Sequence, residues 1–410
     1  MCLQARPAPG ARTLIEVTYS RHSDPRIAAR LCADALRARQ PDLLLVFCGG
    51  KLDPETVMVV LKESLSDVPV VGGASAGGIT RQGIGYSGLE LVVIAFSGWV
   101  TPRILIEEMA PDEVTAGERL GRRVADLASE DAAVLLLYDS VASRPPLRLH
   151  PASQIVSGFH AGLSDRQVRL FGGGLLTDMN LSDGWVLDGD RVRHHLAVAL
   201  VFPPEIEVVC EILHGCRPVS TFMEITRIDG ADVYELDGEP ALVVIERMLG
   251  LQLGESQGQE LSLLATLGQK QGDPFAPYDE NAYVNRLILR ASPSNGSVTL
   301  FEPDFFTGAQ VQIMARDNSL MLESVRHGVA SLREAVREDD NQLALYIDCA
   351  GRASARSGAF REEAEMVVKG LDLPVPFAGF YSGVEIAPFQ GYSRPLDWTG
   401  VLAILRRRPR

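Results

Sequence analysis

One pattern of predicted elements occurs three times along this chain of 410 residues, and it limits the possible folds more than any other feature. In each copy a buried strand is followed by a helix, a second strand, a glycine-rich turn and a closing strand. The copies span residues 41–98, 131–201 and 342–405. Alternating strands and helices place helices on the faces of a sheet, and hairpin turns add antiparallel edges. We therefore expect an α/β fold with layered mixed or antiparallel sheets flanked by helices.

The glycines of the three copies fall at the same point of the pattern. They occur in "PVVGGASAGG" (69–78), "VRLFGGGLLTD" (168–178) and "VPFAGFYSGVEI" (375–386). Glycine at such a point permits a positive φ or lets another group come close to the backbone. That group is either a neighbouring unit of the fold or a ligand. The recurrence indicates an architectural joint, and both interpretations of its purpose stay open.

The sequence changes in character near residue 225, where short strands around turns replace the repeated pattern. We therefore predict two domains, at 24–225 and 226–405. Residues 1–23 are predicted to form an N-terminal extension. The basic run at 406–410 is predicted to be a frayed, solvated tail.

Composition narrows the classes of partner. The formal net charge is −14, which argues against nucleic acid, because phosphate binding needs a basic face. The longest apolar runs are far shorter than the roughly 20 residues of a membrane span, and the first residues lack the apolar core of a secretory signal. The six cysteines contain no CxxC pair. We expect a cytoplasmic protein with reduced thiols and no membrane insertion.

The third copy contains the strongest candidates for chemistry. Cys349 and Arg352 stand at a strand end in "DCAGR", where α/β proteins often place functional groups. An arginine there can hold a carboxylate bidentately or form a structural salt bridge. Glu385 could pair with Arg352 or face a ligand amine. Cys349 would need a nearby base to act as a nucleophile, and the scattered histidines suggest none.

The motifs taken together resemble the FIST family, sensory domains named for F-box and intracellular signal-transduction proteins. The N-terminal part is matched by "PDLLLVFCGG", "VPVVGGASAGGI" and "RLFGGGLLTD", and the C-terminal part by "YIDCAGR" and "GFYSGVEIAP". The resemblance implies a non-enzymatic sensor of small ligands, with amino acids the proposed class. It also implies a separate signalling partner, such as a histidine kinase or a diguanylate cyclase, because no output module is recognised in this chain.

The predicted ligand site follows from the equivalent glycine turns, whose backbone amides can bind a carboxylate. Arg352 would add positive charge, and Asp178 or Glu385 would accept an ammonium group. The predicted ligand-binding residues are Gly73, Ser75, Gly173, Gly174, Asp178, Cys349, Arg352, Tyr381, Ser382 and Glu385. The alternative functions are an enzyme that uses Cys349 and a haem-binding gas sensor.

The haem alternative depends on histidine as an axial ligand. The candidate ligands are His160, His194, His195, His214 and His327. His194 and His195 are adjacent on an expected strand, so we expect their side chains to point to opposite faces. The two could not then bind one ion together.

Overall fold

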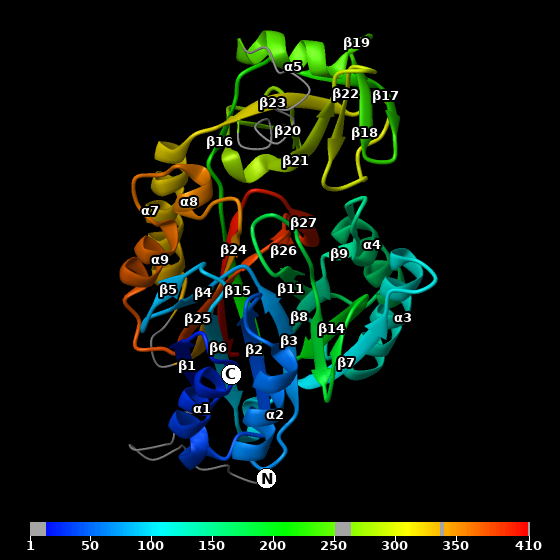
Figure 1. Ribbon diagram of the computed structural model, residues 1–410. Coiled ribbons are helices and arrows are strands. Elements are labelled where there is room, and N and C mark those ends of the chain that lie inside the picture. Colours follow the sequence, from blue (N-terminus) through cyan, green and yellow to red (C-terminus); the bar gives the residue numbers. More distant parts are fainter. Residues whose placement is uncertain (1–13, 251–263, 337–339, 409–410) are drawn as a thin grey trace.

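The computed structural model describes residues 14–250, 264–336 and 340–408, which form a large body and a smaller lobe (Figure 1). The body contains three six-stranded mixed sheets of the same topology. Helices cover these sheets, so the fold is α/β, as the repeats predicted. The repeating unit is one strand and one helix longer than predicted, because both precede each copy.

The three units share one order of elements, to which the second adds the short strands β9 and β10 and the third adds the short helix α8. The first unit comprises β1 (Ile15–Arg21), α1 (Pro25–Leu36), β2 (Leu43–Gly49), α2 (Pro54–Ser64), β3 (Val70–Ser75), β4 (Gly78–Thr80), β5 (Ile84–Gly85) and β6 (Glu90–Phe96). The second comprises β7 (Arg103–Glu108), α3 (Glu113–Leu127), β8 (Ala132–Asp139), β9 (Val141–Ser143), β10 (Arg148–Leu149), α4 (Ala152–Leu163), β11 (Val168–Leu175), β12 (Val186–Gly189), β13 (Val192–Arg193) and β14 (Leu196–Val201). The third comprises β15 (Ile206–Leu213), α7 (Asn318–Ala335), β24 (Asn341–Cys349), α8 (Ser354–Ser357), α9 (Glu363–Leu371), β25 (Phe377–Ser382), β26 (Glu385–Phe389), β27 (Tyr392–Leu396) and β28 (Gly400–Arg407).

The order of the strands is the same in the three sheets. In the first, β6 lies antiparallel between β1 and β2, and β3 runs parallel to β2. In the second, β14 lies between β7 and β8, and in the third β28 lies between β15 and β24. The central strands β2 and β8 are buried along their whole length. This burial explains their continuous apolar sequences, since both faces of each sheet are covered.

The glycine turns join the three units into a closed ring. The hairpin that follows each turn pairs with the sheet of another unit: β12 with β3, β26 with β11, and β4 with β25. A Cβ atom at Gly73 would overlap the carbonyl oxygen of Trp185 from the neighbouring hairpin. One at Gly173 would lie 3.0 Å from both Ile347 and Val384 of the third unit. Close packing between units therefore accounts for these glycines.

A central apolar core lies where the three sheets meet, and three outer cores lie beneath the helices. The ring of Phe47 in the first sheet stacks on that of Phe380 in the third, with centroids 4.1 Å apart. Helices α1 and α2 cover the first sheet, α3 and α4 the second, and α7 and α9 the third. The body is thus one packed unit.

Local sequence explains where α2 begins and where α5 ends. Helix α2 begins at Pro54 because the Asp53 carboxylate accepts the amide of Thr56 at 2.9 Å. Helix α5 (Ala241–Leu249) ends at Gly250, whose φ of 66° is left-handed and suits glycine.

The lobe is inserted between β15 and α7 of the third unit. It contains α5 and the strands β16 (Cys216–Pro218), β17 (Met223–Asp229), β18 (Asp232–Leu236), β19 (Glu239–Pro240), β20 (Ala265–Lys270), β21 (Tyr283–Ser292), β22 (Ser297–Leu300) and β23 (Gln310–Arg316). The sheet closes on itself because β20 pairs with both β21 and β23. The lobe has an apolar core of its own.

Three of the predicted boundaries are wrong. Residue 225 falls inside β17, and the third unit begins earlier, at Ile206. The predicted extension contains β1, which pairs with β6 along its whole length. The predicted tail is partly strand: Arg407 pairs with Ile206, and the Arg406 side chain bonds Glu207 at 2.7 Å. The remaining ends, 1–13 and 409–410, lie outside the described residues.

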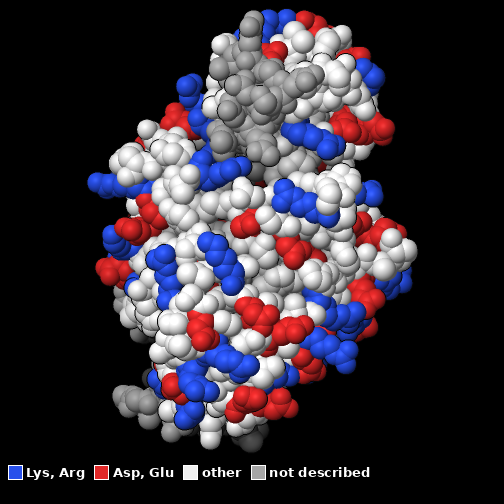
Figure 2. Space-filling model, in the orientation of Figure 1, with Lys and Arg blue, Asp and Glu red and all other residues white. Residues whose placement is uncertain are grey.

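Charged side chains of both signs are intermixed on the face shown in Figure 2. No continuous basic surface is seen among the described residues in this view. The helices that the structure describes include none long and apolar enough to cross a membrane.

Candidate functional site

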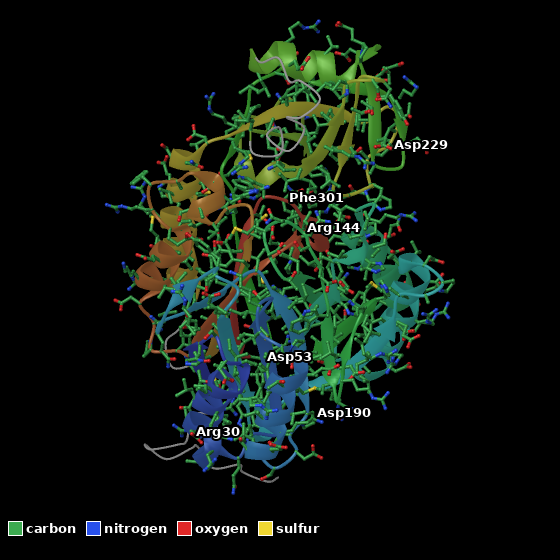
Figure 3. The ribbon with its side chains drawn as sticks, in the orientation of Figure 1. Arg30, Asp53, Arg144, Asp190, Asp229 and Phe301 are labelled. Carbon is green, nitrogen blue, oxygen red and sulfur yellow. The ribbon has the colours of Figure 1, made fainter. Side chains whose placement is uncertain are left out.

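A cavity of about 500 Å³ lies at the junction of the body and the lobe. Figure 3 places Arg144 of the body and Phe301 of the lobe at this junction. Apolar side chains form much of the wall, and arginines supply its charge. The lining residues are Arg144, Leu147, Leu176, Met179, Asn180, Leu181, Leu287, Leu289, Arg290, Phe301, Arg316, Cys349, Ala350, Gly351, Arg356, Ser382, Gly383 and Trp398.

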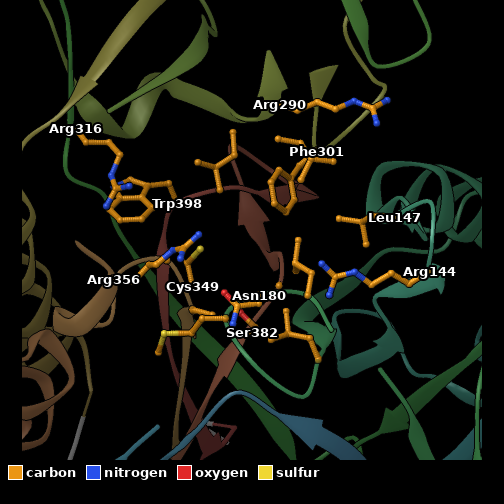
Figure 4. A pocket seen from close by; sticks show the side chains of 18 residues that line it. Arg144, Leu147, Asn180, Arg290, Phe301, Arg316, Cys349, Arg356, Ser382 and Trp398 are labelled. Carbon is orange, nitrogen blue, oxygen red and sulfur yellow. The ribbon is translucent and has the colours of Figure 1, made fainter. Parts of the chain in front are cut away.

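Among the described residues, the lining contains four arginines and no acidic residue. Arg144 comes from the loop between β9 and β10, Arg290 and Arg316 from the lobe, and Arg356 from α8. In Figure 4 the side chains of Arg144 and Arg356 approach the cavity from opposite sides, whereas Arg290 points away from its centre. Among the residues that the structure describes, no ion pair involves Arg144, Arg290 or Arg356. The cavity therefore has a net positive charge in a protein whose total charge is negative.

Arg316 and Trp398 form one wall together, with the guanidinium lying over the indole ring (Figure 4). Burial lowers the pKa of Arg316 to about 9, so this side chain is still mostly protonated at neutral pH. Trp398 is almost fully buried and has a left-handed φ of 61°. A cation over an aromatic face is stabilised by the ring quadrupole. This pair offers both a charge and a flat apolar surface.

Ser382 and Cys349 supply polar atoms to the wall formed by the body. The Ser382 hydroxyl lies 2.6 Å from Glu385 Oε1, and Thr399 donates to the other carboxylate oxygen. Burial raises the pKa of Glu385 to about 8, so the carboxyl is mostly protonated at pH 7. Glu385 is itself fully buried behind Ser382. It therefore presents no negative charge to the cavity.

We expect the Cys349 thiol of the native protein to react slowly with iodoacetamide at pH 8. Burial, and then the charge of Glu385, raise the pKa of Cys349 well above its ordinary value, so the reactive thiolate is rare. Mass spectrometry of the peptide carrying Cys349 measures the rate. The urea-unfolded protein is the control and should react fast. Equal native and unfolded rates at pH 8 would contradict this expectation and favour a catalytic thiol.

Arg352 does not reach the cavity. Its guanidinium is fully buried and bonds the Glu363 carboxylate through Nε at 3.0 Å and Nη2 at 2.6 Å. Nη1 donates to the carbonyl oxygens of His214 and Trp398. Arg352, predicted to hold a ligand, therefore does not line this cavity, and its acid partners are Glu363 and, at 3.6 Å, Asp348 rather than Glu385. The structural salt bridge, the second interpretation of the sequence, is what the structure shows.

Only some of the other predicted site residues line the cavity. Ser382 and Cys349 line it, and Asp178 directly precedes the lining residue Met179. The residues that do not line it are Gly73, Ser75, Gly173, Gly174 and Tyr381. The Ser75 hydroxyl bonds a backbone carbonyl within its own turn, and the Tyr381 hydroxyl bonds Glu362 at 2.8 Å. The three glycine turns therefore do not build one ligand site.

The five predicted haem ligands are dispersed, and none of them is among the lining residues. His160 bonds the Ser393 carbonyl at 2.8 Å, His327 is exposed on α7, and His214 is buried beside Arg352. His194 and His195 do not lie on a strand, because β13 ends before them and His195 has a left-handed φ of 56°. Both residues approach Asp139. The expectation that they point to opposite faces is therefore wrong.

Sequence reasoning missed most of the cavity, including Arg144, Arg316, Arg356 and Trp398. Arg144 and Arg356 carry a weak signal, since each stands in a short segment rich in serine, proline or glycine that follows a core strand end. Arg316 ends a strand of the lobe. No local pattern brings it to Trp398, 82 residues later in the chain.

The fold and the cavity define a class: proteins with a three-unit α/β body, an inserted β-lobe and a binding cavity between them. A model of the FIST N domain matches residues 42–239, and a model of the FIST C domain matches residues 241–388. The chain belongs to the FIST family, which confirms the resemblance noted in the sequence. FIST domains are associated with sensing in signal transduction.

The curated relatives are uncharacterized proteins. One from Mycobacterium tuberculosis (strain ATCC 25618 / H37Rv) is 26% identical over 202 residues, covering 49% of this chain and 51% of the relative. One from Mycobacterium bovis is 28% identical over 207 residues, with the same coverage. The chain thus spans about half the length of these relatives.

Two solved structures align along nearly the whole chain. A cyanuric acid hydrolase from A. caulinodans has a TM-score of 0.32 and 10% identity, covering 97% of this chain and 99% of that one. A chorismatase has a TM-score of 0.33 and 9% identity, covering 96% and 98%. Scores this low support no argument about fold or function.

Proposed function

We propose that this protein is a sensor whose cavity binds a small organic anion with an apolar or aromatic body. The observation that supports this most is the composition of the cavity wall: four arginines, no acidic residue, and a majority of apolar side chains. Guanidinium groups bind carboxylates bidentately, and such charged hydrogen bonds are about twice as strong as neutral ones. A cavity of about 500 Å³ suits a small molecule.

The same wall refines the expectation of an amino-acid ligand. A free amino acid carries an ammonium group, which needs a carboxylate partner if it is to be buried. The lining offers none, and Glu385 is shielded behind Ser382 and mostly protonated. An anion without an ammonium group, such as a 2-oxo or simple carboxylate, therefore fits the cavity better than the corresponding amino acid.

We propose binding without catalysis, with the signal passed to a separate protein. The lining residues that the structure describes include no histidine or carboxylate to act as a general base, and Cys349 is held as a protonated thiol. The cavity lies between body and lobe, so a ligand would contact both and could shift how they sit together. The family's association with signalling suggests a histidine kinase or a diguanylate cyclase as the partner.

A thermal-shift panel tests the ligand class. Each aromatic or branched carboxylate is compared with its neutral amide and with the amino acid of the same side chain. A ligand at a hundred times its dissociation constant adds about 2.7 kcal/mol to the free energy of unfolding. We expect carboxylates to raise the melting temperature more than the amino acids, and amides to have little effect.

The Arg144→Gln/Arg356→Gln double variant should lose the shift, because it removes two charges from the cavity. Arg30→Gln, on the exposed surface of α1, is the matched control and should keep it. Amides that stabilise the protein as well as carboxylates do, or a double variant with the full shift, would contradict the proposal.

A further inference from the structure

A second cluster of side chains, none of which lines the cavity, lies at the carboxyl end of β8 in the second unit. Asp139, His150 and His195 each offer one ligand atom, and the three atoms lie within 4.8 Å of one another. Asp139 is the last residue of β8, His150 precedes α4, and His195 precedes β14. These residues are distant in sequence, so the fold itself assembles the cluster.

We propose that Asp139, His150 and His195 bind a divalent transition metal, with Zn²⁺ the best fit. His150 Nε2 and His195 Nδ1 are 2.9 Å apart. Two imidazole nitrogens on a tetrahedral zinc, each about 2.0–2.1 Å from the metal, lie about 3.3 Å apart. A shift of a few tenths of an ångström therefore brings the pair to ligand spacing.

The outer partner of His150 supports this assignment. His150 Nδ1 lies 2.7 Å from Glu113 Oε1 on α3. With Nδ1–H donating to this carboxylate, the Nε2 lone pair of His150 is left to face the cluster. Metal-binding histidines almost always donate their other ring N–H to a carboxylate, a backbone carbonyl or a water molecule. This outer partner fixes the tautomer and the orientation of the ring.

The buried carboxylate of Asp139 also needs a cation. Its side chain is fully buried, and it accepts backbone amides from Val141 at 3.0 Å and His195 at 2.8 Å. The basic side chains nearest to it are histidines, with His194 Nδ1 at 3.9 Å. A buried carboxylate without a full counter-charge is costly. A metal ion would supply that charge.

The ligand set selects the kind of metal. Two imidazoles and one carboxylate favour Zn²⁺ or a similar transition metal over Mg²⁺ and Ca²⁺, which prefer oxygen ligands throughout. His195 is exposed, so a water molecule can complete a tetrahedral site from the solvent side. The site is independent of the cavity and of the function proposed for it.

Equilibrium dialysis of chelator-treated protein against Zn²⁺ tests the proposal, together with the visible spectrum of the Co²⁺ form. We expect one tightly bound Zn²⁺ per chain, no competition from Mg²⁺, and the strong visible bands of tetrahedral Co²⁺. A protein that binds no Zn²⁺ overturns the proposal. So does a near-ultraviolet thiolate-to-Co²⁺ band, which would place the metal on cysteine.

Three variants locate the metal. His195→Ala removes an exposed ligand, should fold normally by circular dichroism, and should lower Zn²⁺ affinity at least a hundredfold. Glu113→Gln keeps all three ligands and should lower affinity about 10–100-fold, as outer partners of zinc histidines do. His327→Ala, on the exposed face of α7, is the control and should bind like wild type. Unchanged affinity in a folded His195→Ala protein overturns the proposal.

Discussion

Replacing Arg352 with methionine is expected to lower the free energy of unfolding by about 3–5 kcal/mol, the usual cost of leaving one partner of a buried ion pair alone. Within the described part of the chain, Glu363 would lose its one cationic partner while still fully buried, with the Tyr346 hydroxyl at 2.6 Å as its remaining side-chain bond. The carbonyl oxygens of His214 and Trp398 would also lose a donor. Urea unfolding followed by circular dichroism measures the change.

Arg356→Met is the matched control for this experiment. Arg356 stands four residues later, lines the cavity, and has no ion pair within the described part of the chain. Its loss should change stability by less than about 0.5 kcal/mol, as for most surface substitutions. Adding Glu363→Leu to Arg352→Met should recover part of the loss, since the stranded charge is then removed. Equal stability of the two single variants would contradict the structural role of Arg352.

The Gly121→Ala/Gly158→Ala variant is expected to lose about 3 kcal/mol of stability, because added methyl groups would overpack the contact between α3 and α4. A Cβ at Gly121 would overlap the carbonyl oxygen of Phe159, and one at Gly158 would overlap that of Val114. The clashing atoms are backbone, so the helices would have to move apart. Alanine's better helix propensity, about 0.5–1 kcal/mol per site, offsets this only in part.

Thermal and urea unfolding of the double variant measure this effect. Ser157→Ala, on the exposed face of α4, is the control and should stay within about 0.5 kcal/mol of wild type. A double variant more stable than wild type would show that helix propensity outweighs packing and that the two helices have room to separate.

The fold was predictable where the sequence repeats. Strands such as Leu43–Gly49 and helices such as Ala152–Leu163 follow from local pattern, and the glycines mark the joints. The exchange of hairpins between units was not predictable, because pairing such as Val186 with Gly73 depends on tertiary packing that no short window encodes. The alternation in Ile15–Arg21 is a strand signal that was available and missed.

The candidate site was less predictable than the fold. Cys349 and Ser382 follow from their positions at strand ends, and both line the cavity. Arg352 and Arg356 are four residues apart in one segment, yet one is fully buried on Glu363 and the other faces the cavity. The difference comes from tertiary structure: α9 brings Glu363 to Arg352, and the lobe completes the cavity that Arg356 lines. Residue type and strand-end position therefore indicated a charged region without showing which arginine a ligand would meet.

The most direct test of the central claim is a fluorescence titration with two matched dyes. 8-Anilinonaphthalene-1-sulfonate is an aromatic anion, and N-phenyl-1-naphthylamine has the same aromatic body without the charge. We expect one saturable site that prefers the anion. Arg144→Gln/Arg356→Gln should weaken binding of the anion at least tenfold, since a charged hydrogen bond is worth about 1.5–3 kcal/mol, and should leave binding of the neutral dye unchanged. Equal affinity for the two dyes in the wild type, or unchanged anion binding in the double variant, would contradict an anion-binding cavity.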